Sequence, residues 1–211
     1  PGVDQIIAGR LGLAPSVERL LIGYMGCYAA VAALRSARHI VRSDPAARVL
    51  VICVELSTLH LQDSDAVEPL LAMLQFADGA AAAIISADPT GLAIDSPFAA
   101  TLPDSNELIQ WHIGDHGFRM HLSGEVPGAI TAALHPRTNG TSLLPVDPDR
   151  IDSWAVHAGG RSILDAVEGA LNLSKNALVH SREVLQSCGN MSSATLMFVL
   201  ERIMRHDAPP H

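Results

Sequence analysis

The first half of the chain alternates between helical and strand-like spacing of its apolar residues. Over 27–42 the apolar residues recur at helical spacing, and this predicts a helix that ends before Asp44. The continuous apolar runs 48–54 and 79–87 predict strands that are covered on both faces. A helical pattern over 65–76 lies between them. This strand–helix–strand order indicates a layered α/β fold.

The second half continues with shorter strand-like stretches, up to about Leu122, and then with helical patterns. We expect a boundary near Asp88, which divides the chain into the parts 1–88 and 89–211. Ser174 is a suitable N-cap for one helix, and Asn190 is a suitable cap for the last one. The other expected elements are a short helix within 10–19, short strands over 20–24 and 153–157, a loop over 135–150, and helices over 125–134, 161–171, 174–186 and 191–205.

Composition excludes several classes of protein. The formal net charge of −8 argues against a general nucleic-acid binder, because such proteins need many cationic contacts to phosphates. The 3 cysteines form neither a disulfide framework nor a zinc-binding spacing, so we expect a reducing cytoplasm and no metal site. No apolar stretch is long enough to span a membrane, and no signal peptide is visible at the start.

Cys27 is the clearest candidate for chemistry. It opens a small, apolar helix, where unpaired backbone N–H groups favour an anion, and this predicts a lowered thiol pKa. A nucleophilic thiolate needs a base or donor from elsewhere in the fold, and His157 and Asn190 are the candidates. The simpler interpretations are a buried structural cysteine, a core or surface histidine, and an N-cap. We expect Cys53 and Cys188 to be non-catalytic.

Three motifs carry a resemblance to a known family. Gly-Cys-aromatic-Ala stands at 26–29, Trp-x-x-His-x-Gly-Gly at 154–160, and Gly-Asn-Met-Ser-Ser-Ala at 189–194. In this order they resemble the type III polyketide synthases, such as chalcone and stilbene synthases, within the thiolase superfamily. Phe-Ala-Asp-Gly-Ala-Ala at 76–81 and Val-Pro-Gly at 126–128 extend the resemblance over nearly the whole chain.

The resemblance implies a thiolase-like fold of two similar halves in α/β/α/β/α layers. By this comparison, 1–88 holds the latter part of the N-terminal half with the nucleophile, and 89–211 holds a truncated C-terminal half. The family also has an N-terminal segment and C-terminal strands that do not match here. We therefore expect this chain to be the middle part of such an enzyme.

The resemblance also implies a reaction. Cys27 takes a starter acyl group from an acyl-CoA, with His157 paired to the thiolate. His157 and Asn190 then stabilise the enolate formed by decarboxylation of malonyl-CoA, which attacks the acyl group in a Claisen condensation. Coenzyme A thioesters are the substrates, and no metal or redox cofactor is needed. The family implies a homodimer. Because the chain is acidic, basic contacts to coenzyme A must be local.

Several further residues match positions that contact substrates in the family. Phe76 and Met120 match the gate between the coenzyme A tunnel and the polyketide cavity, where Met120 replaces an aromatic residue. Trp111 is expected to narrow the cavity. The other expected substrate contacts are Ser57, His60, Ser192, Gly159 and Gly160, of which the two glycines let backbone approach a ligand closely.

Three alternatives remain open from the sequence. A ketoacyl-ACP synthase III-like enzyme also uses Cys, His and Asn, although its motifs usually differ around Ala158 and Met191. A catalytically impaired fragment or partner subunit is the second alternative. A binding module unrelated to catalysis is the third.

Overall fold

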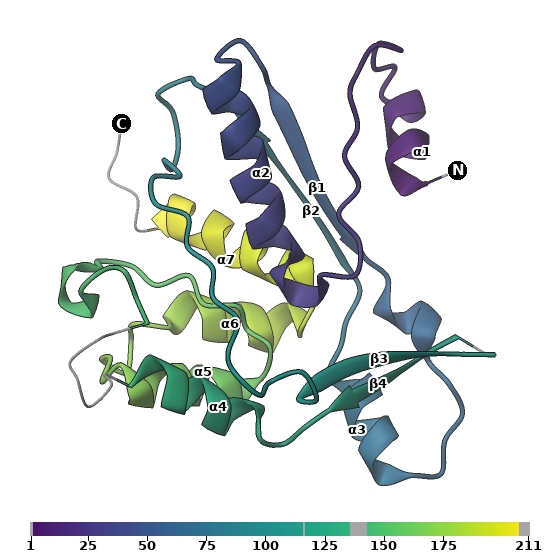
Figure 1. Ribbon diagram of the computed structural model, residues 1–211, viewed down its shortest axis with the longest axis vertical. Helices are drawn as coiled ribbons and strands as arrows, with labels where there is room; N and C mark the ends of the chain where they lie inside the picture. Colours follow the sequence, from purple (N-terminus) through teal and green to yellow (C-terminus); the bar gives the residue numbers. More distant parts are fainter. Residues whose placement is uncertain (1, 116, 136–142, 207–211) are drawn as a thin grey trace.

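A two-stranded antiparallel sheet lies at the centre of the molecule, with two helices packed on one of its faces (Figure 1). In this computed structural model, which describes residues 2–115, 117–135 and 143–206, β1 (Val49–Glu55) pairs with β2 (Gly79–Ile85). Helices α2 (Ala29–Ser43) and α7 (Ser193–His206) share one apolar cluster with the sheet. This cluster contains Ala30, Ala37, Val51, Cys53, Val184, Met191, Ala194, Met197, Val199 and Ile203.

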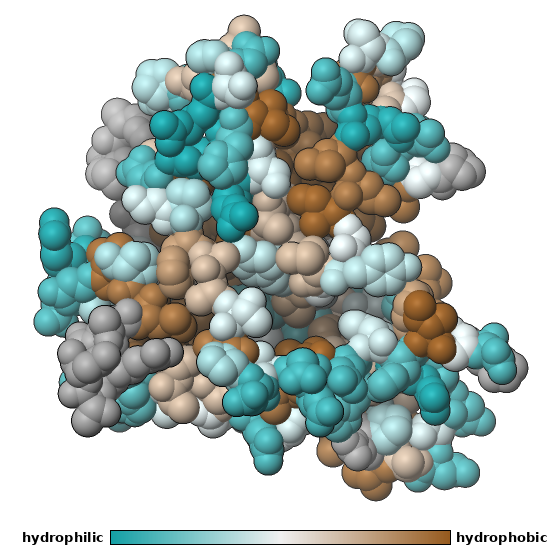
Figure 2. Space-filling model, viewed as in Figure 1, coloured by the Kyte–Doolittle hydropathy of each residue, from teal (hydrophilic) through white to brown (hydrophobic). Residues whose placement is uncertain are grey.

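The other face of this sheet is not covered by any element that the structure describes. Leu50 and Ile52 are 40% and 36% exposed, and Ile84 is 65% exposed. Side chains alternate between the two faces of a strand, so covering one face leaves every second residue open to solvent. The expectation that 48–54 and 79–87 are covered on both faces is therefore wrong for this chain. Figure 2 also shows hydrophobic surface between α1 and α2, beside this sheet.

A second cluster joins the helices of the lower half of Figure 1. Leu164 and Val167 form a helical stripe that packs against Leu178 and Ala158. The remaining elements are α1 (Val3–Arg10), the single turns η1 (Gly26–Tyr28), η2 (Ser57–His60) and η3 (Pro148–Arg150), α3 (Val67–Leu74), the hairpin β3 (Ile109–Gly114) and β4 (Gly117–Leu122), α4 (Val126–Leu134), α5 (Arg161–Ala170) and α6 (Val179–Cys188).

Two expected strands are absent. Residues 20–24 form neither helix nor strand, and Leu20 and Leu21 are 67% and 77% exposed. Residues 153–157 also lie outside any strand. In both cases an apolar run is typical of a strand, but a strand also needs a neighbouring strand with which to exchange backbone hydrogen bonds. Within the described residues neither segment has such a neighbour.

Several helix boundaries also differ from those expected. The first helix is α1 and not a helix within 10–19. Helix α6 begins at Val179 with Leu178 as its N-cap residue, so Ser174 does not cap it. The backbone oxygen of Ser174 instead closes a separate turn with Ala177 N. Helix α7 begins at Ser193, two residues later than expected. Part of the loop expected over 135–150 lies outside the described residues.

Candidate active site

A chain of contacts links the three candidate residues, although they lie far apart in the sequence. Cys27 is in η1, directly before α2, and the Ser192 side chain lies close enough to its thiol to lower the thiol pKa. The backbone N–H of Ser192 donates to Asn190 Oδ1 at 2.9 Å. Asn190 Nδ2 in turn donates to the Gly159 carbonyl at 3.1 Å. Gly159 packs so closely on His157 that an added Cβ would lie 3.4 Å from ring atoms Cδ2 and Nε2.

Asn190 is held from several sides. Its side chain is fixed at both ends, by the Ser192 N–H and the Gly159 carbonyl, and the residue is only 3% exposed. Its backbone carbonyl accepts from Ala77 N at 2.8 Å, next to Phe76. The side-chain oxygen therefore accepts a backbone N–H just before α7 begins, as a capping residue does. One of the two hydrogens of the amide is already donated to the Gly159 carbonyl.

The Cys27 thiol is buried, and burial is the main cause that raises its pKa above the usual value. The negative charge of Glu55 raises this pKa further, and hydrogen bonds with Ser192 and with the backbone oppose the rise only in part. The expected lowering of the thiol pKa is therefore wrong for this structure. Cys27 does lie at the start of a helix, but the cost of burying an anion exceeds the effect of the helix end.

His157 as a residue is half-buried with its Nδ1 atom fully buried, and burial lowers its pKa from 6.5 to about 4. The imidazole is therefore neutral at pH 7. Its Nδ1 atom is buried without a hydrogen-bond partner among the described residues. The resting site thus contains a neutral thiol and a neutral imidazole, which suits proton transfer between them during the reaction better than a standing ion pair.

Glu55 is a site residue that the sequence analysis passed over. It ends β1, and its Oε1 accepts hydrogen bonds from the backbone N–H of Ser193, at 3.2 Å, and from the Ser193 hydroxyl. It thereby ties the sheet to the first turn of α7, and its charge raises the pKa of both Cys27 and Cys53. The sequence does contain a signal for Glu55, because a carboxylate stands there directly after an apolar run.

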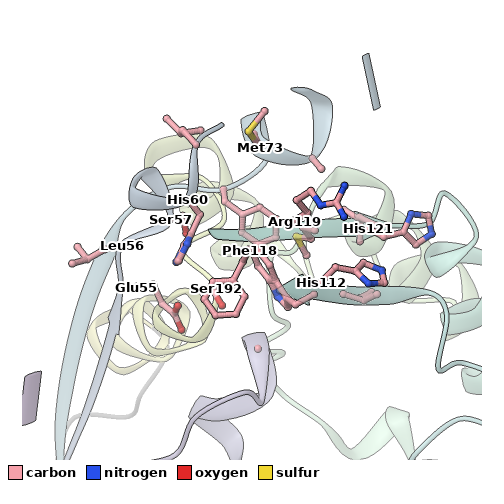
Figure 3. Close-up of a pocket in the computed structure, with 18 of the residues that line it drawn as sticks. Glu55, Leu56, Ser57, His60, Met73, His112, Phe118, Arg119, His121 and Ser192 are labelled. Atoms are coloured by element: carbon pink, nitrogen blue, oxygen red, sulfur yellow. The ribbon is translucent and has the colours of Figure 1, made fainter. Parts of the chain in front are cut away.

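An open cavity of about 1150 Å³ adjoins this group through Glu55 and Ser192 (Figure 3). Among the described residues that line it, Cys27, His157 and Asn190 do not appear. Gly26 and Glu55 border it next to Cys27. Among the substrate contacts expected from the sequence, the structure places Ser57, His60, Phe76, Met120 and Ser192 in its wall. Gly159 and Gly160 are not in this wall, within the part of the chain that the structure describes. Gly159 lies against His157, and Gly160 is the N-cap of α5.

Aromatic rings form one wall of the cavity. The ring of His60 lies 5.9 Å from that of Trp111 and 5.5 Å from that of Phe118, and the Trp111 and Phe118 rings are 5.9 Å apart. Trp111 pairs with Met120 across the β3–β4 hairpin, so the two side chains share one face. Phe118 was not predicted as a site residue, because only the register of the β3–β4 hairpin shows which residues of the two strands share that face.

Among 2–115, 117–135 and 143–206, no three His, Cys, Asp or Glu side chains group as metal ligands. None of the described helices combines the length and apolarity needed to cross a membrane.

Comparisons with known proteins agree with the motifs. The family model "Chalcone and stilbene synthases, N-terminal domain" matches residues 1–89, and the corresponding C-terminal domain model matches residues 94–209. The crystal structure of PKS-I from the brown alga Ectocarpus siliculosus is similar over 98% of this chain, with a TM-score of 0.90 and 34% identity. The C-terminal type III polyketide synthase domain of Steely1, from Dictyostelium, matches 100% of it, with a TM-score of 0.82 and 27% identity.

These matches confirm the thiolase-like α/β fold class that the sequence predicts. The chain spans 56% of the length of PKS-I and 61% of the Steely1 domain.

Proposed function

This chain belongs to the chalcone and stilbene synthase family, and we propose that it carries the catalytic residues of a type III polyketide synthase-like condensing enzyme. The observation that carries the proposal is the set of contacts from Cys27 through Ser192, Asn190 and Gly159 to His157. Acyl transfer requires a nucleophile, a base and a hydrogen-bond donor around one reacting carbon, and these contacts support the assignment of the three roles to Cys27, His157 and Asn190.

The first step loads the enzyme. As the Cys27 sulfur attacks the thioester carbonyl of a starter acyl-CoA, its proton passes to the neutral His157 imidazole. The new carbon–sulfur bond forms, the bond to coenzyme A breaks, and the departing thiolate takes the proton back from His157. This proton route suits a thiol whose pKa is raised and a histidine whose pKa is lowered to about 4.

The second step extends the chain. Malonyl-CoA loses carbon dioxide, and the electron pair of the broken bond becomes an enolate. His157 and the second N–H of the Asn190 amide donate to the enolate oxygen, while the first stays on the Gly159 carbonyl. The enolate carbon then attacks the acyl group on Cys27 and releases the sulfur. Repeated cycles precede cyclisation, and the balance needs neither a metal nor a redox cofactor.

The cavity wall supports the assignment of substrate contacts. Phe76 and Met120 form the gate, and Ser57, His60 and Ser192 contact the growing chain. Gly159 contacts both catalytic side chains, because it packs on the His157 ring and its carbonyl accepts from the Asn190 amide. Gly160 follows it as the N-cap of α5.

The organisation of the whole protein follows the family. We place the boundary between the two parts near residue 88, and this is supported by the family-model limits at 89 and 94. A homodimer and a cytoplasmic location belong to the same proposal. The location is supported by Cys27, Cys53 and Cys188, which are all free thiols.

The test compares two forms of the extender unit. The purified protein receives a starter acyl-CoA with either malonyl-CoA or malonyl groups on an acyl carrier protein, and product is measured by mass spectrometry. We expect product from malonyl-CoA, loss of product in Cys27→Ala, and unchanged product in the control Cys188→Ala. Product from the carrier protein alone would favour the ketoacyl-ACP synthase III-like alternative. Full activity in Cys27→Ala would contradict the proposal.

A further inference from the structure

The segment that carries His157 lies between two apolar clusters without belonging to a sheet. Trp154 and Val156 pack with the α5–α6 cluster, and Ala155 packs with the sheet cluster. This alternation is that of an extended chain. It places His157 on the side of Ala155, toward Asn190 and α7.

Ser181 replaces the missing partner strand. It lies on α6, is 0% exposed, and its hydroxyl bonds the same residue twice. Oγ accepts from Val156 N at 3.1 Å and donates to Val156 O at 2.8 Å. In an extended chain, the N–H and C=O of one residue point to the same side, where a neighbouring strand would normally bond both. One buried side chain therefore satisfies both backbone groups of the residue that precedes His157.

The imidazole itself has no equivalent anchor. Nδ1 of His157 has no hydrogen-bond partner among the described residues, so no side chain fixes the ring through that atom. What remains is the position of the backbone and the packing of Gly159 on the ring. The orientation of His157 therefore depends on the peptide units next to it, and Ser181 holds one of these in place.

We propose that Ser181 is a positioning residue for His157, acting through its two hydrogen bonds to the Val156 backbone. Its importance for catalysis rests on the role proposed above for His157, but the positioning itself does not. Without the hydroxyl, a buried N–H and a buried C=O lose their partner together, and the segment shifts or admits water to satisfy them. The ring then samples several orientations instead of one.

The test measures the His157 ring directly by NMR in the full 211-residue chain, with the ring signals assigned by their loss in His157→Gln. The side chains introduced by Ser181→Thr and Ser181→Val have nearly the same shape, but only Ser181→Thr keeps the hydroxyl. Ser187→Ala is the matched control, because Ser187 lies on the same helix and donates to the Glu183 carbonyl at 2.7 Å, but is exposed. We expect sharp, native-like His157 signals in Ser181→Thr and Ser187→Ala. In Ser181→Val we expect shifted or broadened signals that titrate closer to pH 6.5, the ordinary value for histidine.

Identical His157 signals and titration in Ser181→Thr and Ser181→Val would overturn the proposal. If neither variant folds, the unmodified protein decides. The amide hydrogen of Val156 should exchange with deuterium at least about a hundredfold more slowly than that of an unstructured peptide, because it is buried and hydrogen-bonded. Exchange of the Val156 amide hydrogen at the rate of an unstructured peptide would overturn the proposal. In an active preparation, Ser181→Val should slow acyl loading by up to about a hundredfold, the cost of a small misplacement. A loss of loading with unchanged ring signals would also count against positioning.

Discussion

At the scale of single residues, the Asn190 amide has two separable roles. Its oxygen accepts from Ser192 N and fixes the start of α7, whereas its nitrogen carries the second hydrogen, which we propose for the enolate. A substitution that keeps the oxygen but removes the donor can therefore tell a cap from a catalytic group.

We predict that Asn190→Ala slows malonyl-CoA decarboxylation by about a hundredfold or more, the usual cost of one lost oxyanion donor. Acyl loading on Cys27 should continue in this variant. Asn190→Asp retains an acceptor for the cap but cannot donate, so decarboxylation should be slowed there as well. Carbon dioxide release and the mass of the acyl-enzyme measure the two steps, with the exposed Asn176→Ala as control. Normal decarboxylation in Asn190→Asp would reduce Asn190 to a cap.

Cys27, His157 and Asn190 are predicted from the sequence as the catalytic residues because each stands in a distinctive motif. The direction of the thiol pKa was not, because the first turn of a helix predicts a lowered value and the opposing cost depends on tertiary burial. The contacts of Glu55 and Ser181 were not predicted either, because they too depend on the tertiary structure. They bond Ser193 and Val156, which are remote in the sequence, and no local pattern shows such pairs.

At the scale of elements, the site depends on close packing between β2 and the turn before α7. Gly79 opens β2, and a Cβ built there would lie 2.8 Å from Cβ of Met191, the neighbour of Asn190. A contact this short with the base of a side chain is relieved only by moving backbone. The small size of residue 79 therefore lets the Asn190 turn approach the sheet.

We predict that Gly79→Ala destabilises the fold by about 1–3 kcal/mol, the usual cost of overpacking a well-packed interior. Gly128→Ala is the matched control, because a Cβ there meets nothing within 4 Å and the residue lies in α4. It should instead stabilise by about 0.5–1 kcal/mol. Urea unfolding of the three proteins measures both effects. Equal stability of Gly79→Ala and the unmodified chain would show that the turn is not held this closely.

Elements with strong periodicity were predicted well, and those that need a partner were not. α2, β1 and α5 follow from apolar spacing alone, with small shifts at their ends. The segments 20–24 and 153–157 have equally strand-like residues, but neither pairs with another strand among the described residues. A single sequence shows the secondary-structure propensity of a segment, but it does not show which segment packs beside it in the fold.

At the scale of the whole molecule, the buried His157 makes stability depend on pH. Its pKa is about 4 in the folded chain and 6.5 when unperturbed, so between these values the unfolded state binds an extra proton. The stabilisation is complete above pH 6.5 and is lost as the pH falls toward 4. The difference between the two values corresponds to about 3 kcal/mol.

We therefore predict that the unmodified chain loses about 3 kcal/mol more stability than His157→Gln when the pH is lowered from 7 to 4. The difference between the two proteins isolates this residue from other groups that titrate in acid. His39→Gln is the control, since it makes the same exchange at an exposed position of α2. Chemical unfolding at several pH values gives the free energies. Parallel pH curves for the unmodified chain and His157→Gln would mean that His157 is not buried in its neutral form.

The central claim is that Cys27 is the nucleophile that receives the acyl group, and acyl-enzyme trapping tests it most directly. The purified protein is mixed with a starter acyl-CoA, quenched in acid, digested and mapped by mass spectrometry. The account predicts one acyl group, on the peptide that contains Cys27, with no acyl group on the peptides of Cys53 and Cys188. It predicts further that this label disappears in Cys27→Ala and persists in Cys188→Ala. An acyl group found on Cys53 or Cys188, or retained in Cys27→Ala, would contradict the account.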